Sequence, residues 1–263
     1  MTSFLTYDPG LSRVRVSLSA IRTFYGADET GNVQRSPDQV RWTTVRGGSA
    51  ITITATSPDL DDYEFTPDVI NYYRFTPTGI LTILTDSITP DLAGEWWLKH
   101  LRYPFLNMTI TPSDAGDATR PSMSGIFNIV GSSLPVVVSL PRASAQWNLT
   151  LSIADLGELD ALNALLATGD VLLLQVPSGS IIRGGYFAAG DTAETRNTVP
   201  SQQRWVTIPL TEAAAPAATV TPVTSIWQTV IDDYASWTGL VTAQATWADV
   251  VQLVGAPGDV IVS

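Results

Sequence analysis

The sequence contains no cysteine, a single histidine (His100) and a single lysine (Lys99) in 263 residues. Without cysteine the chain can form no disulfide, thiolate metal site or thiol nucleophile, and its redox compartment cannot be inferred. One histidine excludes a histidine-based catalytic triad and a metal site built from several histidines. We therefore interpret His100 as a structural residue that lies beside Trp96 and Trp97 in a connecting segment.

Charge is also scarce in this chain. Charged side chains are 15% of the residues, and 25 acidic against 14 basic side chains give a net charge of −11. An acidic surface without a basic patch repels phosphate, so no nucleic-acid recognition is expected. The first ten residues show no signal-peptide pattern, and apolar runs such as VLLLQV are much shorter than a membrane span. With 44% hydrophobic residues, the composition predicts a folded, soluble, unsecreted protein without membrane insertion.

The first third of the chain has the alternating polar and apolar pattern of β-strands. We expect short strands within residues 13–21, 33–45, 51–57, 62–75 and 80–84. Trp42 and the triplet at 73–75 (YRF) resemble features of fibronectin type III and immunoglobulin-like modules. Residues 1–88 are therefore expected to form a small β-sandwich of that type, with Asn71 where such modules often have a tyrosine.

The next segments break this pattern. Residues 89–107 are rich in aromatic side chains and are expected to be a packed connector between two domains. Residues 110–122 have a loop composition without periodicity, and so long a loop is typical of a functional segment or one that reaches a partner.

Residues 108–213 are expected to form a second β domain with one helix, at about 154–168. Leucines recur at helical spacing from Leu156 to Leu166, Gly169 stands where a left-handed cap belongs, and residues 171–176 read as a buried strand. Further strands are expected within 125–130, 134–140, 144–153, 181–190 and 204–213. The sheet edges at 125–140 and 204–213 are candidate surfaces for self-association.

Residues 214–263 are expected to be a linker followed by short helices. Trp227, Trp237 and Trp247 recur every ten residues in patterns typical of amphipathic helices. So small a segment cannot bury its own apolar faces and needs another surface.

Three groups of residues are candidates for a chemical site. The glycines near 177–180 (PSGS) and at Gly184 lack the spacing of a phosphate-binding loop. The cluster Asp59, Asp61, Asp62 and Glu64 lacks EF-hand spacing and reads as a solvated turn. The acids Asp155, Glu158 and Asp160 are explained by the positive end of the helix dipole. We predict no catalytic, cofactor-binding or metal-binding residues.

The eight tryptophans allow two interpretations. Exposed rings would form a sugar-stacking platform, as in carbohydrate-binding modules. Trp42 and Trp147, however, lie within alternating strand patterns, which favours packing in a core or a subunit interface.

Several stretches of the chain carry a family resemblance: 42–48 (WTTVRGG), 103–107 (YPFLN), 125–131 (GIFNIVG) with Pro135 and Val136, 162–169 (LNALLATG), 185–191 (GYFAAGD), 234–237 (YASW) and 246–249 (TWAD). In these stretches the chain resembles the minor tail proteins of siphophages that infect actinobacteria.

The resemblance implies a structural, non-enzymatic virion protein of the tail tip, assembled in the host cytoplasm. Its middle domain would be similar to tail-tube and distal tail proteins and would form a homo-oligomeric ring, expected to be a hexamer. The ring would continue the tail tube and dock other tail-tip proteins, without a cofactor. The alternatives are a carbohydrate- or receptor-binding module of the virion and, in a third class, a wall hydrolase, for which the sequence offers no carboxylate pair.

Overall fold

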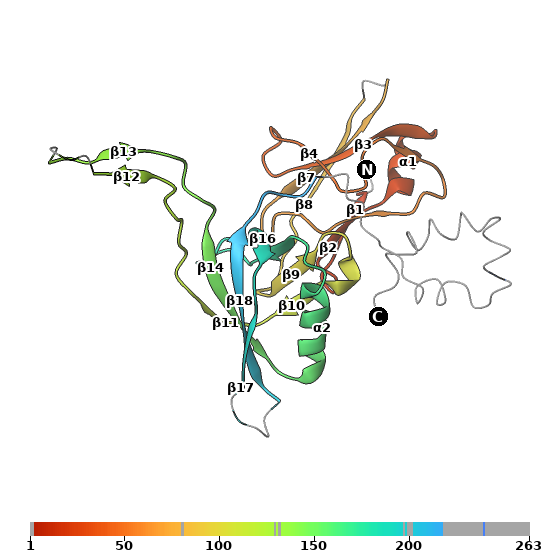
Figure 1. The fold of residues 1–263 in the computed structure, drawn as a ribbon. Helices are drawn as coiled ribbons and strands as arrows, with labels where there is room; N and C mark the ends of the chain where they lie inside the picture. The colour runs from red at the N-terminus through yellow and green to blue at the C-terminus, as the bar shows by residue number, and fades with distance from the viewer. Residues whose placement is uncertain are drawn as a thin grey trace.

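The computed structural model describes residues 3–79, 82–128, 130, 133–196, 198, 202–217 and 239. Over these residues the protein is mainly β, as predicted, with two α-helices and a short 3-10 helix, η1 (Pro104–Leu106). Two packed bodies lie side by side, and a long hairpin extends away from them (Figure 1).

The N-terminal lobe, which holds α1 and β1 to β8, contains two antiparallel sheets over one core. The first sheet has the order β1 (Leu5–Asp8), β2 (Arg13–Val16), β6 (Leu60–Asp62). The second comprises β4 (Thr43–Thr44), β3 (Glu29–Ser36), β7 (Asn71–Pro77) and β8 (Leu84–Ile88), with β5 (Ile51–Ile53) also paired to β3. The core is built from alternate residues of these strands, such as Val14, Val33 and Phe75.

The expected strand at 13–21 is wrong beyond Val16. The chain turns into helix α1 (Leu18–Tyr25), which buries Leu18 and Ile21 in the core of the lobe. Leu18 and Ile21 are three residues apart, a spacing that places them on the same face of a helix but on opposite faces of a strand. Gly26 then ends the helix at a φ of 74°, the left-handed conformation that glycine adopts without strain.

The second body is organised around one large antiparallel sheet. Its order is β10 (Met108–Ile110), β9 (Trp96–His100), β15 (Leu172–Gln175), β16 (Gly185–Ala189), β18 (Arg204–Glu212), β14 (Gln146–Ile153), β11 (Pro112–Ala115), and β17 (Ala193–Arg196) pairs with β18. Strand β9 comes from the segment expected to be a connector, and it pairs with β10 on one side and β15 on the other.

Two further expectations about this sheet are wrong. The segment 110–122 is not wholly a loop, because β11 pairs with β14. Residues 204–213 are not a sheet edge, because β18 pairs with β14 along one side and with β16 and β17 along the other. β18 is therefore not available as an edge for another subunit.

The predicted helix is present as α2 (Leu156–Leu166), and its capping explains the acids before and within its first turn. Asp155 Oδ1 accepts the backbone N–H of Glu158 at 2.9 Å, and Glu158 Oε2 accepts the N–H of Ala154 at 2.7 Å. This reciprocal pair satisfies donors that a helix start leaves unpaired. Leu159, Leu162 and Leu165 then pack into the core of the large sheet.

Replacing the cap tests this account of α2. Asp155→Ala is expected to lower the free energy of unfolding by about 1 kcal/mol, because a helix N–H loses its acceptor. Urea denaturation measures the loss. Asp160→Ala, an exposed change on the same helix, is the control and is expected to stay within about 0.5 kcal/mol of the parent. Equal losses in both variants would contradict the capping role.

The extended hairpin carries the two-stranded sheet of β12 (Gly125–Phe127) and β13 (Val136–Val138). We name residues 120–142 the arm. At the other end of the chain, the helices predicted within 214–263 lie outside the described residues, of which this region contributes 214–217 and 239.

Candidate assembly site

The alternation of side chains on β9, β15 and β16 gives the large sheet two different faces. Leu98, Leu172 and Leu174 belong to the core that includes α2. The intervening residues face the N-terminal lobe; they are Trp97, Lys99, Leu173, Gln175 and Tyr186. All four residues of β15 are buried because the strand is covered on both faces.

We name the contact between this second face and the N-terminal lobe the seam. Lys99 Nζ donates to the carbonyl and hydroxyl oxygens of Ser12 and to the carbonyl of Tyr63, the last at 3.2 Å. Gln175 Nε2 donates to the carbonyls of Tyr63 at 3.1 Å and Phe65 at 2.7 Å. These bonds satisfy backbone groups that the packing removes from water, so the seam is specific as well as buried.

Lys99 is the most unusual residue of the seam, because its side chain is fully buried. Its Nζ lies 4.8 Å from the ring centre of Phe65 and 5.7 Å from that of Trp97. Burial lowers the pKa of the Lys99 amine well below its usual value, since desolvation disfavours the charged form. The only lysine of the chain is therefore a packing residue, and the sequence offered no signal for this.

The acidic cluster is not the solvated turn that the sequence suggested. Asp62 is 1% exposed and accepts hydrogen bonds from the Arg35 guanidinium and, at 2.8 Å, from the Tyr73 hydroxyl. Asp61 accepts from Arg13 at 2.5 Å and from Arg15 at 3.1 Å.

Glu64 continues this paired network to the seam. It forms a two-pronged pair with Arg46, both N···O distances being 2.9 Å, and accepts the Tyr186 hydroxyl at 2.7 Å. Burial, and then the Glu64 charge, raise the pKa of Tyr186. Only Asp59 of the four acids is substantially exposed, at 36% of its side chain. The cluster is thus an ion-pair network between strands and across the seam.

His100 lies on strand β9 and not in a connecting segment. Its Nδ1 accepts the backbone N–H groups of Arg102 and Tyr103 at 3.1 and 2.9 Å, so the proton of the neutral ring is on Nε2. Nε2 lies 3.1 Å from Thr168 Oγ1 and 3.3 Å from a carboxylate oxygen of Asp170. Burial lowers the pKa of His100, and the Asp170 charge opposes this only in part.

The lowered pKa of His100 predicts a loss of stability in acid. The unfolded imidazole, with a pKa near 6.5, takes up a proton that the folded one resists. The stabilisation is therefore complete above that unfolded pKa and is lost as the pH falls toward and through the folded pKa, by at most about 1.4 kcal/mol per pH unit. Urea unfolding at about pH 7.5 and about pH 5.5, either side of the usual histidine pKa, measures it.

His100→Gln is the matched control, because it removes the only histidine of the chain. We expect this variant to be less stable than the parent at both pH values but to lose less on acidification. An identical pH dependence in both proteins would show that His100 does not titrate differently on folding.

The remaining sequence candidates have structural roles. Residues 177–180 form a turn in which Asp68 accepts the N–H of Ser178 at 2.5 Å. Gly184 lies where an added Cβ would come within 2.7 Å of the Leu174 carbonyl, so close packing on β15 requires glycine. Within the described residues no group of three or more histidine, aspartate or glutamate side chains is arranged to bind a metal ion.

The described tryptophans mostly support the packing interpretation. Trp147 is buried and meets Phe187 edge to face, with ring centres 5.7 Å apart, and Trp97 lies in the core of the N-terminal lobe. Trp42 is only half-buried, and the guanidinium of Arg74 lies over its ring at 4.1 Å. The three C-terminal tryptophans lie outside the described residues.

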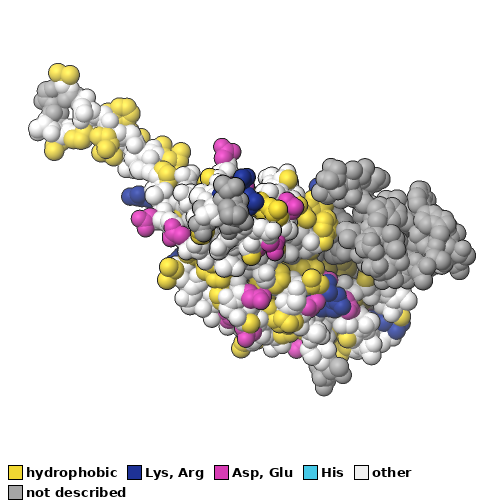
Figure 2. Space-filling view, turned by 90° about the horizontal axis from the view of Figure 1, so that it is seen from below, with side chains coloured by type: hydrophobic (Ala, Val, Ile, Leu, Met, Phe, Trp, Pro, Cys, Tyr) yellow, Lys and Arg dark blue, Asp and Glu magenta, His cyan; other side chains and the backbone are white. Residues whose placement is uncertain are grey.

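The arm is the most exposed apolar element of the described chain. Ile126 is 68% exposed, Phe127 57%, Leu134 75% and Val137 54%. Residues 121–141 contain no charged side chain, and Arg120 and Arg142 stand at the two ends of this stretch. Figure 2 shows the arm as hydrophobic and uncharged polar surface, with basic and acidic side chains only near its base.

Both faces of the arm are apolar. The register places Ile126 opposite Val137 on one face and Phe127 opposite Val136 on the other. A separate two-stranded hairpin is at best marginally stable in water, and apolar patches of this kind mark interaction sites. The arm is therefore the candidate interaction surface of the described residues.

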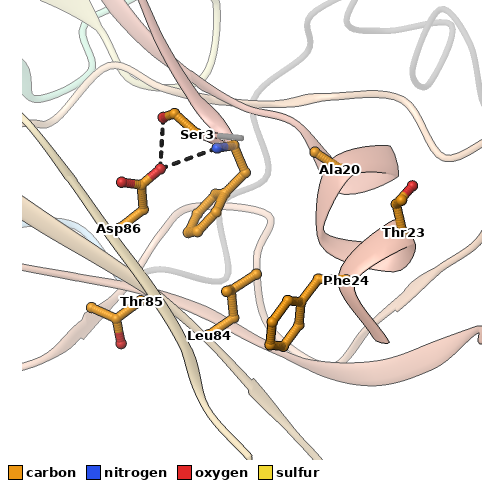
Figure 3. A pocket seen from close by; sticks show the side chains of 8 residues that line it. Ser3, Ala20, Thr23, Phe24, Leu84, Thr85 and Asp86 are labelled. Carbon is orange, nitrogen blue, oxygen red and sulfur yellow. Dashed lines mark hydrogen bonds between the residues drawn. The ribbon is translucent and has the colours of Figure 1, made fainter. Parts of the chain in front are cut away.

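A groove of about 440 Å³ lies between α1 and β8 in the N-terminal lobe. Its walls include Phe4, Phe24 and Leu84 (Figure 3). At one end Asp86 accepts hydrogen bonds from the hydroxyl of Ser3 at 2.6 Å and the backbone N–H of Phe4 at 3.1 Å. The Asp86 carboxylate thus holds the residues that lead into β1.

Among the described residues, neither α-helix is long and apolar enough to span a membrane. No protein-family model matches the chain, and no curated protein matches it. Among solved structures it is similar to the Dit protein (gp 19.1) of SPP1, described as a paradigm of the hub adsorption apparatus in phages that infect Gram-positive bacteria. The identity is 12% and the TM-score 0.35, over 44% of this chain and 49% of the SPP1 protein, so the match spans about half the length of that protein.

Proposed function

We propose that this protein is a structural component of a bacteriophage tail tip, a distal or minor tail protein of a siphophage, that assembles with itself into a ring. The observation that carries the proposal is the arm, an uncharged apolar hairpin that extends away from its own body. The assignment to a tail tip rests on the sequence motifs that resemble those of minor tail proteins. The assignment to a phage of actinobacteria rests on these motifs alone.

A head-to-tail ring makes use of such an arm. In a closed ring each subunit gives one surface and receives a different one. The arm would be the surface given, lying against the large sheet or the N-terminal lobe of the next copy. Within this proposal residues 108–213 build a ring, expected to be hexameric, that continues the tail tube, and residues 1–88 contact neighbouring tail-tip proteins.

The alternative function, a carbohydrate- or receptor-binding module, has less support. It needs exposed aromatic rings with a free face. Trp147 is in the core, and Arg74 lies over the ring of Trp42.

Mass measurement and negative-stain imaging of the purified full-length protein test the proposal. We expect a closed oligomer of one size over a wide concentration range, with six copies as the expected number. Assembled tails should show the same ring at the tip. A protein that stays monomeric at high concentration and is absent as a ring from tails would overturn the proposal.

A further inference from the structure

We propose that residues 213–217, which follow β18, form a clasp that crosses the seam and keeps it closed. The backbone N–H of the first residue of the clasp donates to the carbonyl of Tyr186, in the large sheet, at 2.8 Å. At the other end, in the N-terminal lobe, Arg46 Nη2 donates to the carbonyl of Pro216 at 3.2 Å and Nη1 to that of Ala217 at 2.7 Å. The clasp is therefore bound to both bodies, and this inference does not depend on the ring.

The first observation is that the lobe itself fixes Arg46. This residue lies in the turn after β4, and the turn is bonded to β3 on both sides. The N–H of Val45 donates to the carbonyl of Val33 at 2.9 Å, and the N–H of Val33 donates to that of Gly48 at 2.8 Å. Glu64 holds the Arg46 side chain in its two-pronged pair, and Arg46 is only 5% exposed. A guanidinium held in this way loses little freedom when it binds two further carbonyls.

The second observation is that the hydrogen bonds form a closed circuit across the seam. Glu64, which pairs with Arg46, also accepts the hydroxyl of Tyr186 at 2.7 Å. The carbonyl of the same Tyr186 accepts the N–H of Ala213, from which the clasp leads back to Arg46. Two segments of the second body, β16 and the clasp, thus bind one ion pair of the lobe. Release of the clasp therefore changes the environment of the Glu64–Tyr186 contact.

The third observation is how short the clasp is. Only Ala214 and Ala215 lie between its two bound ends, and both are exposed. A chain spans at most about 3.6 Å per residue, so the backbone can carry Ala213 and Pro216 no more than about 11 Å apart. Pro216 also disfavours a helical conformation at the residue before it, which keeps the clasp extended. The lobe and the sheet therefore cannot separate at this end of the seam while Arg46 holds the clasp, and a partner that lifts the clasp from Arg46 would loosen the seam.

A thiol placed in the seam reports its opening, because the natural chain has no cysteine to interfere. Leu173 pairs with Lys99 on one side and with Tyr186 on the other, and it is 6% exposed. In the full-length variant Leu173→Cys, the introduced thiol reacts with the thiol reagent DTNB when the seam opens. Its labelling rate in the absence of denaturant therefore measures opening.

In this reporter protein Arg46→Lys removes the fork that binds two carbonyls and keeps a positive charge opposite Glu64. We expect labelling to be at least about tenfold faster, because hydrogen bonds from a charged donor are lost. Arg74→Lys is the matched control, since this arginine of the same lobe bonds to Gln34 and not across the seam. It is expected to leave the labelling rate within about twofold of the reporter protein.

A second variant keeps every native side chain of the reporter protein. Four Gly-Ser repeats inserted between Ala214 and Ala215 lengthen the clasp, and we expect labelling to be about fivefold faster because a longer loop joins the two bound ends. The same insertion between Asp191 and Thr192, which are exposed between β16 and β17, is the control. It is expected to leave the rate within about twofold.

Labelling rates that do not change in either clasp variant would overturn the inference. Faster labelling in Arg46→Lys alone would overturn it as well, because Arg46 would then act through Glu64 within the lobe. Urea denaturation of each variant is the second measurement. If the population of the globally unfolded state rises by the same factor as the labelling rate, the thiol reacts from unfolded protein and there is no clasp. Both measurements are made on the monomer as well as on any assembly, so failure of the ring proposal is seen separately.

Discussion

Asp62→Asn is expected to lower the free energy of unfolding by about 3–5 kcal/mol, because it leaves a buried charge without its partner. Asp62 is 1% exposed, and its carboxylate accepts from the guanidinium of Arg35. Asparagine keeps the shape and an acceptor for the Tyr73 hydroxyl, so the loss reports on charge and not on a cavity. Urea denaturation followed by tryptophan fluorescence measures it.

Two further variants separate this effect from a general sensitivity of the cluster. Asp59→Asn removes a neighbouring acid of the same type that is 36% exposed, and it is expected to change stability by less than about 0.5 kcal/mol. The double variant R35M/D62N removes both charges, and we expect it to recover more than half of the loss. Similar losses for Asp59→Asn and Asp62→Asn would show that the network is not buried as described.

The difference in burial between Asp59 and Asp62 is a feature that the sequence alone does not predict. A run of acids between strands is normally solvated, and nothing local distinguishes these two residues. What distinguishes them is Arg35, which lies 27 residues away along the chain on a different sheet. Pairing between distant residues leaves no local pattern, so the network could not be predicted from one sequence.

The elements that were predicted well are those in which local pattern and burial coincide. On β14, Trp147, Leu149, Leu151 and Ile153 alternate with less buried residues, and α2 combines a leucine stripe with a cap. On β9, by contrast, Trp97 faces the N-terminal lobe while Leu98 faces α2, and both are buried. A strand covered on both faces does not alternate, which is why Trp96–His100 was expected to be a connector.

The arm was predicted only in part, for a related reason. The strands at 125–130 and 134–140 were expected, but as a part of the domain sheet. Their apolar residues have the composition of a core, yet Ile126 and Val137 are more than half exposed. Apolar composition predicts that a surface will be covered and does not reveal whether the same chain covers it.

The second large effect concerns the arm, and we expect it on self-association and not on folding. Val137→Asp is expected to weaken self-association at least about tenfold, because the interface would have to bury an unpaired carboxylate. The stability of the monomer should change by less than about 0.5 kcal/mol, since Val137 is 54% exposed there. Analytical ultracentrifugation measures the first quantity and urea denaturation under dissociating conditions the second.

Ser139→Asp is the control, because it adds the same charge two residues along the arm at a position that is already polar and exposed. We expect it to weaken association less than Val137→Asp does, since a polar rim tolerates a charge that an apolar contact does not. If Val137→Asp instead destabilised the monomer and left association unchanged, the arm would pack on its own body. If both variants associated as the parent does, the arm would not lie in the interface between copies of this chain, and the ring contact proposed for it would be overturned.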